Sequence, residues 1–113
     1  MLKSQLEQRL IKLHSVNMFC VYQVKVNDVV RYIGVTNNLK RRVSEHKRYI
    51  KSGKSKYLYE MIRSAGDVSI EFSEVCQFDK KIDALRMEAY MILTDYYDKK
   101  LLWQSAPFSF KYF

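Results

Sequence analysis

The sequence predicts a compact single α/β domain, in which a small three-stranded antiparallel β-sheet is flanked by helices in the order αββααβα. Three observations predict it. The chain has 113 residues, which is enough for one domain. Hydrophobic residues make up 48% of it and there are only 3 Gly and 1 Pro, which favours a packed core over a linker or a disordered tail. Segments of alternating polarity and segments of helical periodicity follow one another along the chain.

The first quarter of the chain predicts a short amphipathic helix and a β-hairpin. Ser4-Gln5-Leu6-Glu7 is a capping-box pattern, and leucines follow it at helical spacing up to about residue 14. Residues 18–26 and 29–35 are rich in β-branched and aromatic side chains, and Asn27-Asp28 between them is a turn sequence. We therefore expect these two segments to pair as antiparallel strands.

Two helices are expected after the hairpin. Asn37 or Asn38 can cap the first of them, which Gly53 would end. Ser55 is expected to cap the second, shorter helix, which Gly66 would end.

A strand and a long helix complete the predicted elements. Apolar and polar residues alternate from Val68 to Ser73, as in a half-buried strand. Asp79 is expected to open the last helix, in which apolar residues from Ile82 to Tyr96 recur every three or four positions. Three parts result: an N-terminal amphipathic helix over residues 1–17, a folded domain over residues 18–98, and an aromatic tail over residues 99–113 that packs on the domain or on a partner.

The sequence shows neither a membrane-spanning segment nor a signal peptide. No apolar run approaches the roughly 20 residues that a membrane span needs. Acid and amide side chains near the N-terminus differ from the continuous apolar stretch of a signal peptide. We therefore expect a soluble, intracellular, cytoplasmic protein with no membrane partner.

Positive charge is concentrated in the middle of the chain. The formal net charge is +8, and the stretch from Lys40 to Arg63 holds nine basic residues against two acidic ones. Tyr49, Tyr57 and Tyr59 are interleaved with these cations, a combination that suits contact with sugars and bases. A solvated helix face is the plainer explanation. The predicted nucleic-acid contacts are Lys40, Arg41, Lys47, Arg48, Lys51, Lys54 and Lys56.

Two polar side chains of the first long helix lean into its apolar arc. On a helical wheel with Leu39 at zero, Val43 and Ile50 lie at about 40° and 20°. His46 falls inside this arc at about −20°, and Arg42 lies on its edge at about −60°. A satisfied core histidine and an arginine with a buried aliphatic stem are the plainer explanations.

Glu88 repeats this pattern on the last helix, three residues after Leu85 and four before Ile92. A carboxylate there must be paired, metal-bound or partly solvated, because burial of an isolated charge is costly. A cation, an imidazole and a carboxylate that all lean towards the sheet are poorly explained by packing alone.

Several short motifs follow one another in a fixed order. They are Val21-Tyr22, Tyr32-Ile33-Gly34, Thr36-Asn37-Asn38-Leu39-Lys40-Arg41-Arg42, His46 and the distant Glu88. Together they resemble the GIY-YIG nuclease family over roughly residues 19–97, so residues 18–98 are expected to form a GIY-YIG nuclease-like domain. Two positions depart from the family pattern. Cys20 replaces the first glycine, and Leu102-Trp103-Gln104 stands where the family often has an asparagine.

The resemblance implies an endonuclease that hydrolyses DNA phosphodiester bonds with one divalent metal ion. Glu88 would hold Mg²⁺, for which Mn²⁺ can substitute, and Arg42 would donate to the non-bridging phosphate oxygens. Tyr22, Tyr32 or His46 would take the proton of the attacking water, and the sequence does not choose among them. The implied catalytic residues are Tyr22, Tyr32, Arg42, His46 and Glu88.

Other functions stay open at this point. The same fold could serve a catalytically weak or inert nucleic-acid-binding or regulatory protein, and an unrelated basic adaptor would explain the charge alone. RNA stays open beside DNA as the nucleic acid. The choice of a cleavage site would come from a homodimer, a DNA structure or a specificity-giving protein partner, unless the protein cuts with little preference.

Overall fold

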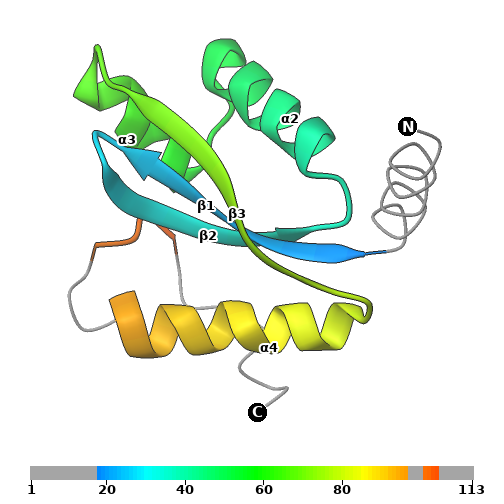
Figure 1. Cartoon of the computed structure of the whole chain (residues 1–113). Coiled ribbons are helices and arrows are strands. Elements are labelled where there is room, and N and C mark those ends of the chain that lie inside the picture. The colour runs from blue at the N-terminus through cyan, green and yellow to red at the C-terminus, as the bar shows by residue number, and fades with distance from the viewer. Residues whose placement is uncertain (1–17, 97–100, 105–113) are drawn as a thin grey trace, which may run out of the picture.

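A computed structural model describes residues 18–96 and 101–104 (Figure 1). The elements are β1 (Phe19–Val26), β2 (Val29–Thr36), α2 (Leu39–Ser52), α3 (Tyr57–Ala65), β3 (Ile70–Phe78), α4 (Lys81–Met91) and the π-helical turn η1 (Ile92–Tyr96). The order β-β-α-α-β-α and the antiparallel sheet confirm the predicted fold class. The helix predicted within residues 1–17 lies outside the described residues.

The three strands form one antiparallel sheet in the order β2-β1-β3, so β2 and β3 are its edges. Asn27 and Asp28 join β1 to β2 with φ angles of 51° and 66°. Two successive positive φ angles are typical of the type I′ turn, whose twist matches that of paired strands. Across β1 and β2 this register places Tyr22 opposite Gly34.

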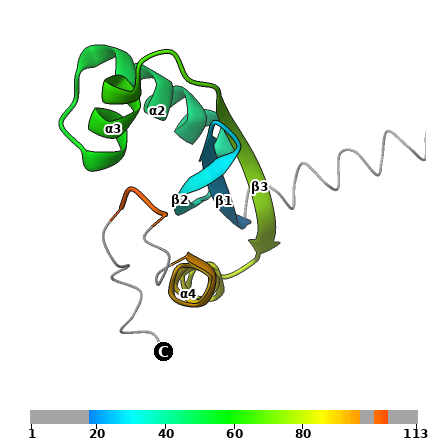
Figure 2. The same cartoon turned by 90° about the vertical axis from the view of Figure 1, so that its left-hand side faces the viewer.

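Helices cover both faces of the sheet. α2 and α3 lie on one face and α4 lies on the other, as Figures 1 and 2 show. Alternation along β1 directs Val21 into a cluster with Ala84 of α4 and Ile92 of η1. The neighbouring Tyr22 and Val24 belong to a separate cluster on the α2 side. The sheet therefore divides the core into two layers.

The ends of α2 are set by the residues that the sequence predicts. The Asn38 side chain accepts a hydrogen bond of 3.0 Å from the Arg41 backbone N–H, as an N-cap does. Gly53 ends the helix in the left-handed conformation with φ 79°, which glycine adopts without the steric cost of a β-carbon.

Two predicted helix starts are wrong by one residue. Lys56 caps α3 and Lys80 caps α4, and neither cap residue makes a side-chain hydrogen bond to the helix backbone. Ser55, expected as a cap, instead donates its hydroxyl to the Glu60 carboxylate at 2.9 Å. Asp79 lies one residue before the cap of α4. Helix α3 still ends at Gly66, as predicted.

Residues 101–104 lie along the outer edge of β2. The Trp103 backbone N–H donates to the Arg31 carbonyl at 2.6 Å, and Arg31 Nη1 donates to the Leu101 carbonyl at 2.9 Å. The Gln104 side chain accepts from Ile33 N at 2.6 Å and donates to Ile33 O at 2.9 Å. These contacts satisfy backbone groups that an edge strand leaves open.

Both cysteines are free thiols, Cys20 buried and Cys76 half-buried. Burial, with the nearby charge of Glu74, raises the pKa of Cys20 to about 11, so its thiol is protonated at neutral pH. In the part of the chain that the structure describes, every helix is too short or too polar to cross a bilayer.

Candidate active site

A buried hydrogen-bonded cluster lies between the sheet and the helices α2 and α3. His46 of α2 places Nε2 at 2.7 Å from the Tyr22 hydroxyl of β1 and Nδ1 at 2.8 Å from the Tyr59 hydroxyl of α3. No more than 1% of the surface of any of these three residues is exposed. The ring of Phe72 stacks on the imidazole with centroids 5.8 Å apart. Two tyrosine hydroxyls and one imidazole are thus held together out of water.

Local structure explains how Tyr22 reaches this cluster. The side chain of Tyr22 crosses the backbone of its strand partner Gly34, where a β-carbon would lie 2.7 Å from the tyrosine ring and hydroxyl. Real β-carbons do not approach other atoms so closely, so glycine is needed at the end of the Tyr32-Ile33-Gly34 motif.

Arg42 lies one helical turn before His46 and is half-buried. Its Nε donates to the Tyr22 hydroxyl at 3.3 Å and its Nη1 to the Glu45 carboxylate at 3.0 Å. Burial disfavours the charged guanidinium, but the hydrogen bonds to Tyr22 and Glu45, together with the charges that Tyr22 and Tyr32 carry when ionised, outweigh it and raise the Arg42 pKa. Arg42 therefore supplies a permanent positive charge beside the Tyr22 hydroxyl.

Lys56 supplies a second cation to the cluster. Its Nζ donates to the Tyr32 hydroxyl at 3.3 Å and lies 4.8 Å from the centroid of the Tyr32 ring and 5.4 Å from that of Tyr59. Lys56, one of the predicted nucleic-acid contacts, is half-buried against these rings and belongs to the tyrosine cluster.

The surroundings of His46 and Tyr22 shift the pKa values of both side chains. Burial, followed by the charges of Arg42 and Lys56, lowers the pKa of His46 to about 3, so the imidazole is neutral at pH 7. Burial also raises the pKa of Tyr22, and Tyr32 raises it further. The hydrogen bond and charge of Arg42 act in the opposite direction but do not offset this rise. Both groups are therefore uncharged in the free protein.

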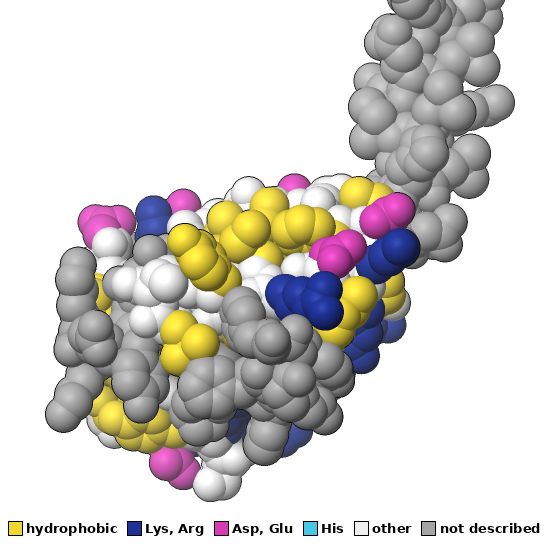
Figure 3. All heavy atoms as spheres, turned by 90° about the horizontal axis from the view of Figure 1, so that it is seen from below, with side chains coloured by type: hydrophobic (Ala, Val, Ile, Leu, Met, Phe, Trp, Pro, Cys, Tyr) yellow, Lys and Arg dark blue, Asp and Glu magenta, His cyan; other side chains and the backbone are white. Residues whose placement is uncertain are grey.

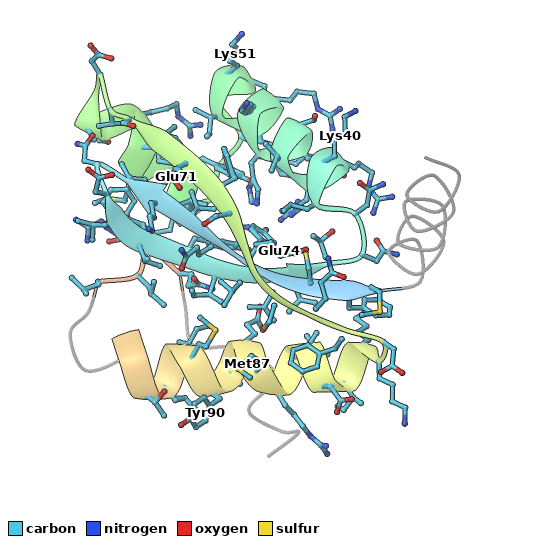
Figure 4. The ribbon with its side chains drawn as sticks, in the orientation of Figure 1. Lys40, Lys51, Glu71, Glu74, Met87 and Tyr90 are labelled. Carbon is cyan, nitrogen blue, oxygen red and sulfur yellow. The ribbon has the colours of Figure 1, made fainter. Side chains whose placement is uncertain are left out.

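The other predicted nucleic-acid contacts lie on the solvent side of α2 and in the loop after it. Figure 4 shows Lys40 and Lys51 on the outer side of this helix. Arg41 pairs with Glu45 at 3.5 Å. All of the following are exposed: Lys40, Arg41, Lys47, Arg48, Lys51 and Lys54. On the α4 side, apolar side chains are prominent, with Lys, Arg, Asp and Glu side chains among them (Figure 3).

A groove of about 670 Å³ runs beside the cations of α2. Its apolar wall includes Ile50 and Ile70, so it lies between the end of α2 and the start of β3. The complete lining is Lys47, Arg48, Ile50, Lys51, Ser52 and Ile70.

The three tyrosines interleaved with the basic residues have different environments. Tyr57 is 55% exposed and Tyr49 is half-buried, whereas Tyr59 is buried. Tyr59 therefore cannot contact a base from its present position, which corrects the sequence-based interpretation of this residue. The three-residue spacing of Tyr59 and Ile62 is the signal that could have placed Tyr59 on the buried face of α3. Glu45, which pairs with both Arg41 and Arg42, is another residue of the site that the sequence did not predict.

Glu88 is carried by α4, on the other face of the sheet from His46 (Figure 1). It is half-buried, as its position on the flank of the apolar arc predicted. Among residues 18–96 and 101–104, no three His, Cys, Asp or Glu side chains gather as a metal-binding group. One carboxylate still fits Mg²⁺, which usually keeps several waters and takes its other ligands from substrate phosphates. A phosphate reaching both Glu88 and Arg42 has to lie at an edge or end of the sheet.

Comparison with known proteins identifies a matching family model. A family model described as the GIY-YIG catalytic domain matches residues 18–99, a span that holds Tyr22, Tyr32, Arg42, His46 and Glu88. No curated protein and no solved structure matches the chain.

Proposed function

Because this chain belongs to the GIY-YIG catalytic domain family, whose fold is of the nuclease type, we propose that it is a divalent-metal-dependent endonuclease that hydrolyses phosphodiester bonds of DNA. The observation that carries this proposal is the position of Arg42. Its half-buried guanidinium donates to the buried Tyr22 hydroxyl. A cation that would bind phosphate therefore lies beside a hydroxyl that would transfer a proton.

Arg42 would bind the non-bridging oxygens of the scissile phosphate. A guanidinium has five N–H donors, and the contacts to Tyr22 and Glu45 use two of them among the described residues. The other donors of the planar fork suit phosphate oxygens, where negative charge grows in the transition state. Glu45 would hold the fork in this orientation.

The tyrosine pair would accept the proton of the attacking water. Tyr32 is half-buried and closer to solvent, whereas Tyr22 is buried with its hydroxyl between Arg42 and His46. The raised pKa of Tyr22 means that its phenolate needs more positive charge than Arg42 alone supplies. Mg²⁺, held by Glu88 together with water and phosphate oxygens, would polarise the phosphate and add positive charge at the site.

The exposed cations of α2 would hold the DNA backbone near this site. Contacts of Lys47, Arg48 and Lys51 with phosphates fix position and orientation but do not read sequence. The groove beside these three residues offers apolar surface next to cations, which suits a strand whose phosphates and sugars lie against α2.

The test is cleavage of supercoiled plasmid with Mg²⁺, with Mn²⁺ and with EDTA. We expect metal-dependent nicking or linearisation that Glu88→Ala abolishes. Glu71→Ala is the matched control, because Glu71 is an exposed glutamate on β3 and its loss should leave cleavage unchanged. Circular dichroism of both variants shows that the fold is retained.

Other results would change the assignment. Salt-sensitive DNA binding without cleavage in either metal would favour the catalytically inert nucleic-acid-binding protein. Cleavage of a single-stranded RNA in preference to the plasmid would change the substrate but not the chemistry.

A further inference from the structure

Lys56 occupies the N-cap of α3, a position at which a lysine does nothing for the helix. Its backbone is extended, and its carbonyl accepts a hydrogen bond of 2.9 Å from the Glu60 N–H, as an N-cap carbonyl does. N-caps favour Ser, Thr, Asp and Asn, whose side-chain oxygens accept from the helix backbone. The Lys56 side chain makes no such bond, and the positive end of the helix dipole disfavours a cation there. Helix stability therefore does not explain this lysine.

The contacts of the Lys56 side chain lie at the tyrosine cluster. Its Nζ donates to the Tyr32 hydroxyl of β2 at 3.3 Å and lies 4.8 Å from the centroid of that ring. The ring of Tyr59 lies on another side, with its centroid 5.4 Å away. Lys56 is half-buried, whereas its chain neighbours Ser55 and Tyr57 are exposed. The ammonium thus belongs to the candidate site and not to the solvated start of the helix.

This contact determines how Tyr32 presents its hydroxyl. An ammonium has three N–H donors and no acceptor, so the Tyr32 oxygen accepts from Lys56 and its own proton points away from Nζ. The Tyr32 ring also packs edge-on against His46, with centroids 5.6 Å apart. Tyr32 is half-buried, whereas Tyr22 and Tyr59 are each 1% exposed. Among these three tyrosines, Tyr32 is therefore the one that a water from solvent reaches most readily.

We infer that Lys56 is a positioning residue for Tyr32, whose ammonium holds the Tyr32 oxygen ready to accept a proton. The inference rests on the proposed function, in which the tyrosine pair takes the proton of the attacking water. A tyrosine accepts that proton only as a phenolate, which thereby returns to the phenol. A donor that points at the phenol oxygen stabilises this ionised form. Lys56 would then act through Tyr32 and not as a contact to the DNA backbone.

Lys56→Ser separates this role from helix stability, because serine is a preferred N-cap residue. Lys80→Ser is the matched control, since Lys80 is the exposed N-cap of α4 and also makes no side-chain cap bond. Circular dichroism should show that both variants melt close to the wild type. In Lys56→Ser we expect kcat for plasmid cleavage to fall by about 10- to 100-fold with KM unchanged, part of what positioned proton transfer contributes. Lys80→Ser should leave both constants unchanged. Wild-type kcat in Lys56→Ser would overturn the inference.

Lys56→Met is a second variant, which keeps most of the aliphatic stem and removes only the charge. We expect the same loss of kcat as in Lys56→Ser, because the ammonium is absent from both. Wild-type cleavage by Lys56→Met would mean that packing of the stem suffices, and the inference would be wrong.

The salt dependence of DNA binding, measured in EDTA, distinguishes positioning from backbone contact. A lysine that binds a phosphate contributes about one unit to the slope of log K against log salt concentration. Lys56→Met should leave this slope unchanged, whereas Lys51→Met, at an exposed position of α2, should reduce it by about one. A slope reduced equally in Lys56→Met would place Lys56 among the phosphate contacts and contradict the inference.

A spectroscopic measurement tests the contact without relying on cleavage. In full-length protein labelled with ¹³C at tyrosine Cζ, the Tyr32 resonance is the one that disappears in Tyr32→Phe. We expect this resonance to shift in Lys56→Met and to stay in place in Lys80→Ser, and an unmoved resonance in Lys56→Met would refute the contact. A shifted resonance in a wild-type protein that does not cut DNA would contradict the proposed function and support the placement of Lys56 on Tyr32. Cleavage that is equally fast without the ammonium would contradict the role of Lys56 and leave the proposed function intact.

Discussion

The ring of Tyr22 lies against Gly34, its partner on the neighbouring strand, where a β-carbon would approach the ring and hydroxyl to 2.7 Å. The absence of a side chain at Gly34 therefore sets how close Tyr22 can lie to the sheet and where its hydroxyl meets His46 and Arg42. A packing contact between two strands thus determines the geometry of a hydrogen-bonded cluster.

Gly34→Ala is expected to destabilise the fold by about 1–3 kcal/mol, the usual cost of overpacking, and to displace the Tyr22 hydroxyl. Gly53→Ala is the comparison. No atom lies within 4 Å of its β-carbon, but its φ of +79° makes alanine strained, at about 1–2 kcal/mol. Urea unfolding should show similar losses for both variants, whereas only Gly34→Ala should reduce cleavage. Unchanged cleavage in Gly34→Ala would mean that the position of Tyr22 is not critical.

Arg42→Ala is expected to reduce kcat by about 10²-fold or more, because a donor to the developing phosphate charge is lost. Arg42→Lys should restore little, since a lysine cannot reproduce the planar fork. Arg41→Ala is the neighbouring control, an exposed arginine that pairs with the same Glu45. It should weaken DNA binding slightly and leave kcat unchanged. Steady-state cleavage kinetics distinguish these outcomes, and an Arg42→Ala variant within about threefold of wild type would rule out the phosphate role.

The stability of the protein should fall as the pH falls below about 6.5, because of His46. Its pKa is about 3 in the folded protein against 6.5 for an unperturbed histidine, so the unfolded chain takes up the proton first. This contribution is fully present above the unfolded value and is lost progressively as the pH approaches the folded one, at about 1.4 kcal/mol per pH unit. Urea unfolding between about pH 7 and pH 5 should show this slope. His46→Gln, if it folds at pH 7, should lack the part of this slope that His46 contributes. If the variant and the wild type show the same slope, other titrating groups cause the pH dependence.

Gln104→Ala should destabilise the protein by about 1–3 kcal/mol, because it leaves the backbone N–H and C=O of Ile33 without their partners. Gln77→Ala is a suitable control, since Gln77 is exposed and its amide contacts only the Glu74 side chain among the described residues. Thermal unfolding of the two variants measures the difference. Equal melting temperatures would show that the Gln104 contact does not hold β2.

DNA affinity should depend steeply on salt through the cations of α2. Replacement of Lys47, Arg48 and Lys51 by alanine should reduce the slope of log K against log salt concentration by about 3, roughly one for each lost phosphate contact. Lys80→Ala/Lys81→Ala removes two exposed cations at the start of α4 and should change the slope little. Fluorescence anisotropy on a duplex across a salt series gives both values. A slope unaffected by the α2 substitutions would place the DNA elsewhere.

Periodicity and turn residues were enough to predict the elements that position the candidate site. The Asn27-Asp28 turn, the Asn38 cap and the left-handed Gly53 are local features, and each lies where the sequence predicts it. The helical wheel also placed His46 on the buried side of α2. The caps of α3 and α4 were less predictable, because lysines occupy them without side-chain hydrogen bonds and nothing in their residue type marks the position.

The cluster itself depends on contacts between residues far apart in the sequence. Tyr59 meets His46 across 13 residues and Tyr22 meets it across 24, which no local pattern encodes. Tyr59 was therefore interpreted from its basic neighbours rather than from its burial. The Gln104 contact with Ile33 spans 71 residues. The sequence shows that residue 104 carries a side-chain amide, but it does not show that this amide contacts the Ile33 backbone.

The attachment of residues 101–104 to β2 also has a consequence for the order of events during synthesis. The hairpin leaves the ribosome well before Gln104, which lies 71 positions after Ile33. Until then the backbone of β2 from Arg31 to Ile33 lacks these partners and can pair with other chains, as unpaired strand edges do in incomplete domains. Translation that stops between η1 and Trp103 would therefore yield a chain with its sheet elements present but one edge open. Such fragments should be more prone to aggregation than chains that include Gln104.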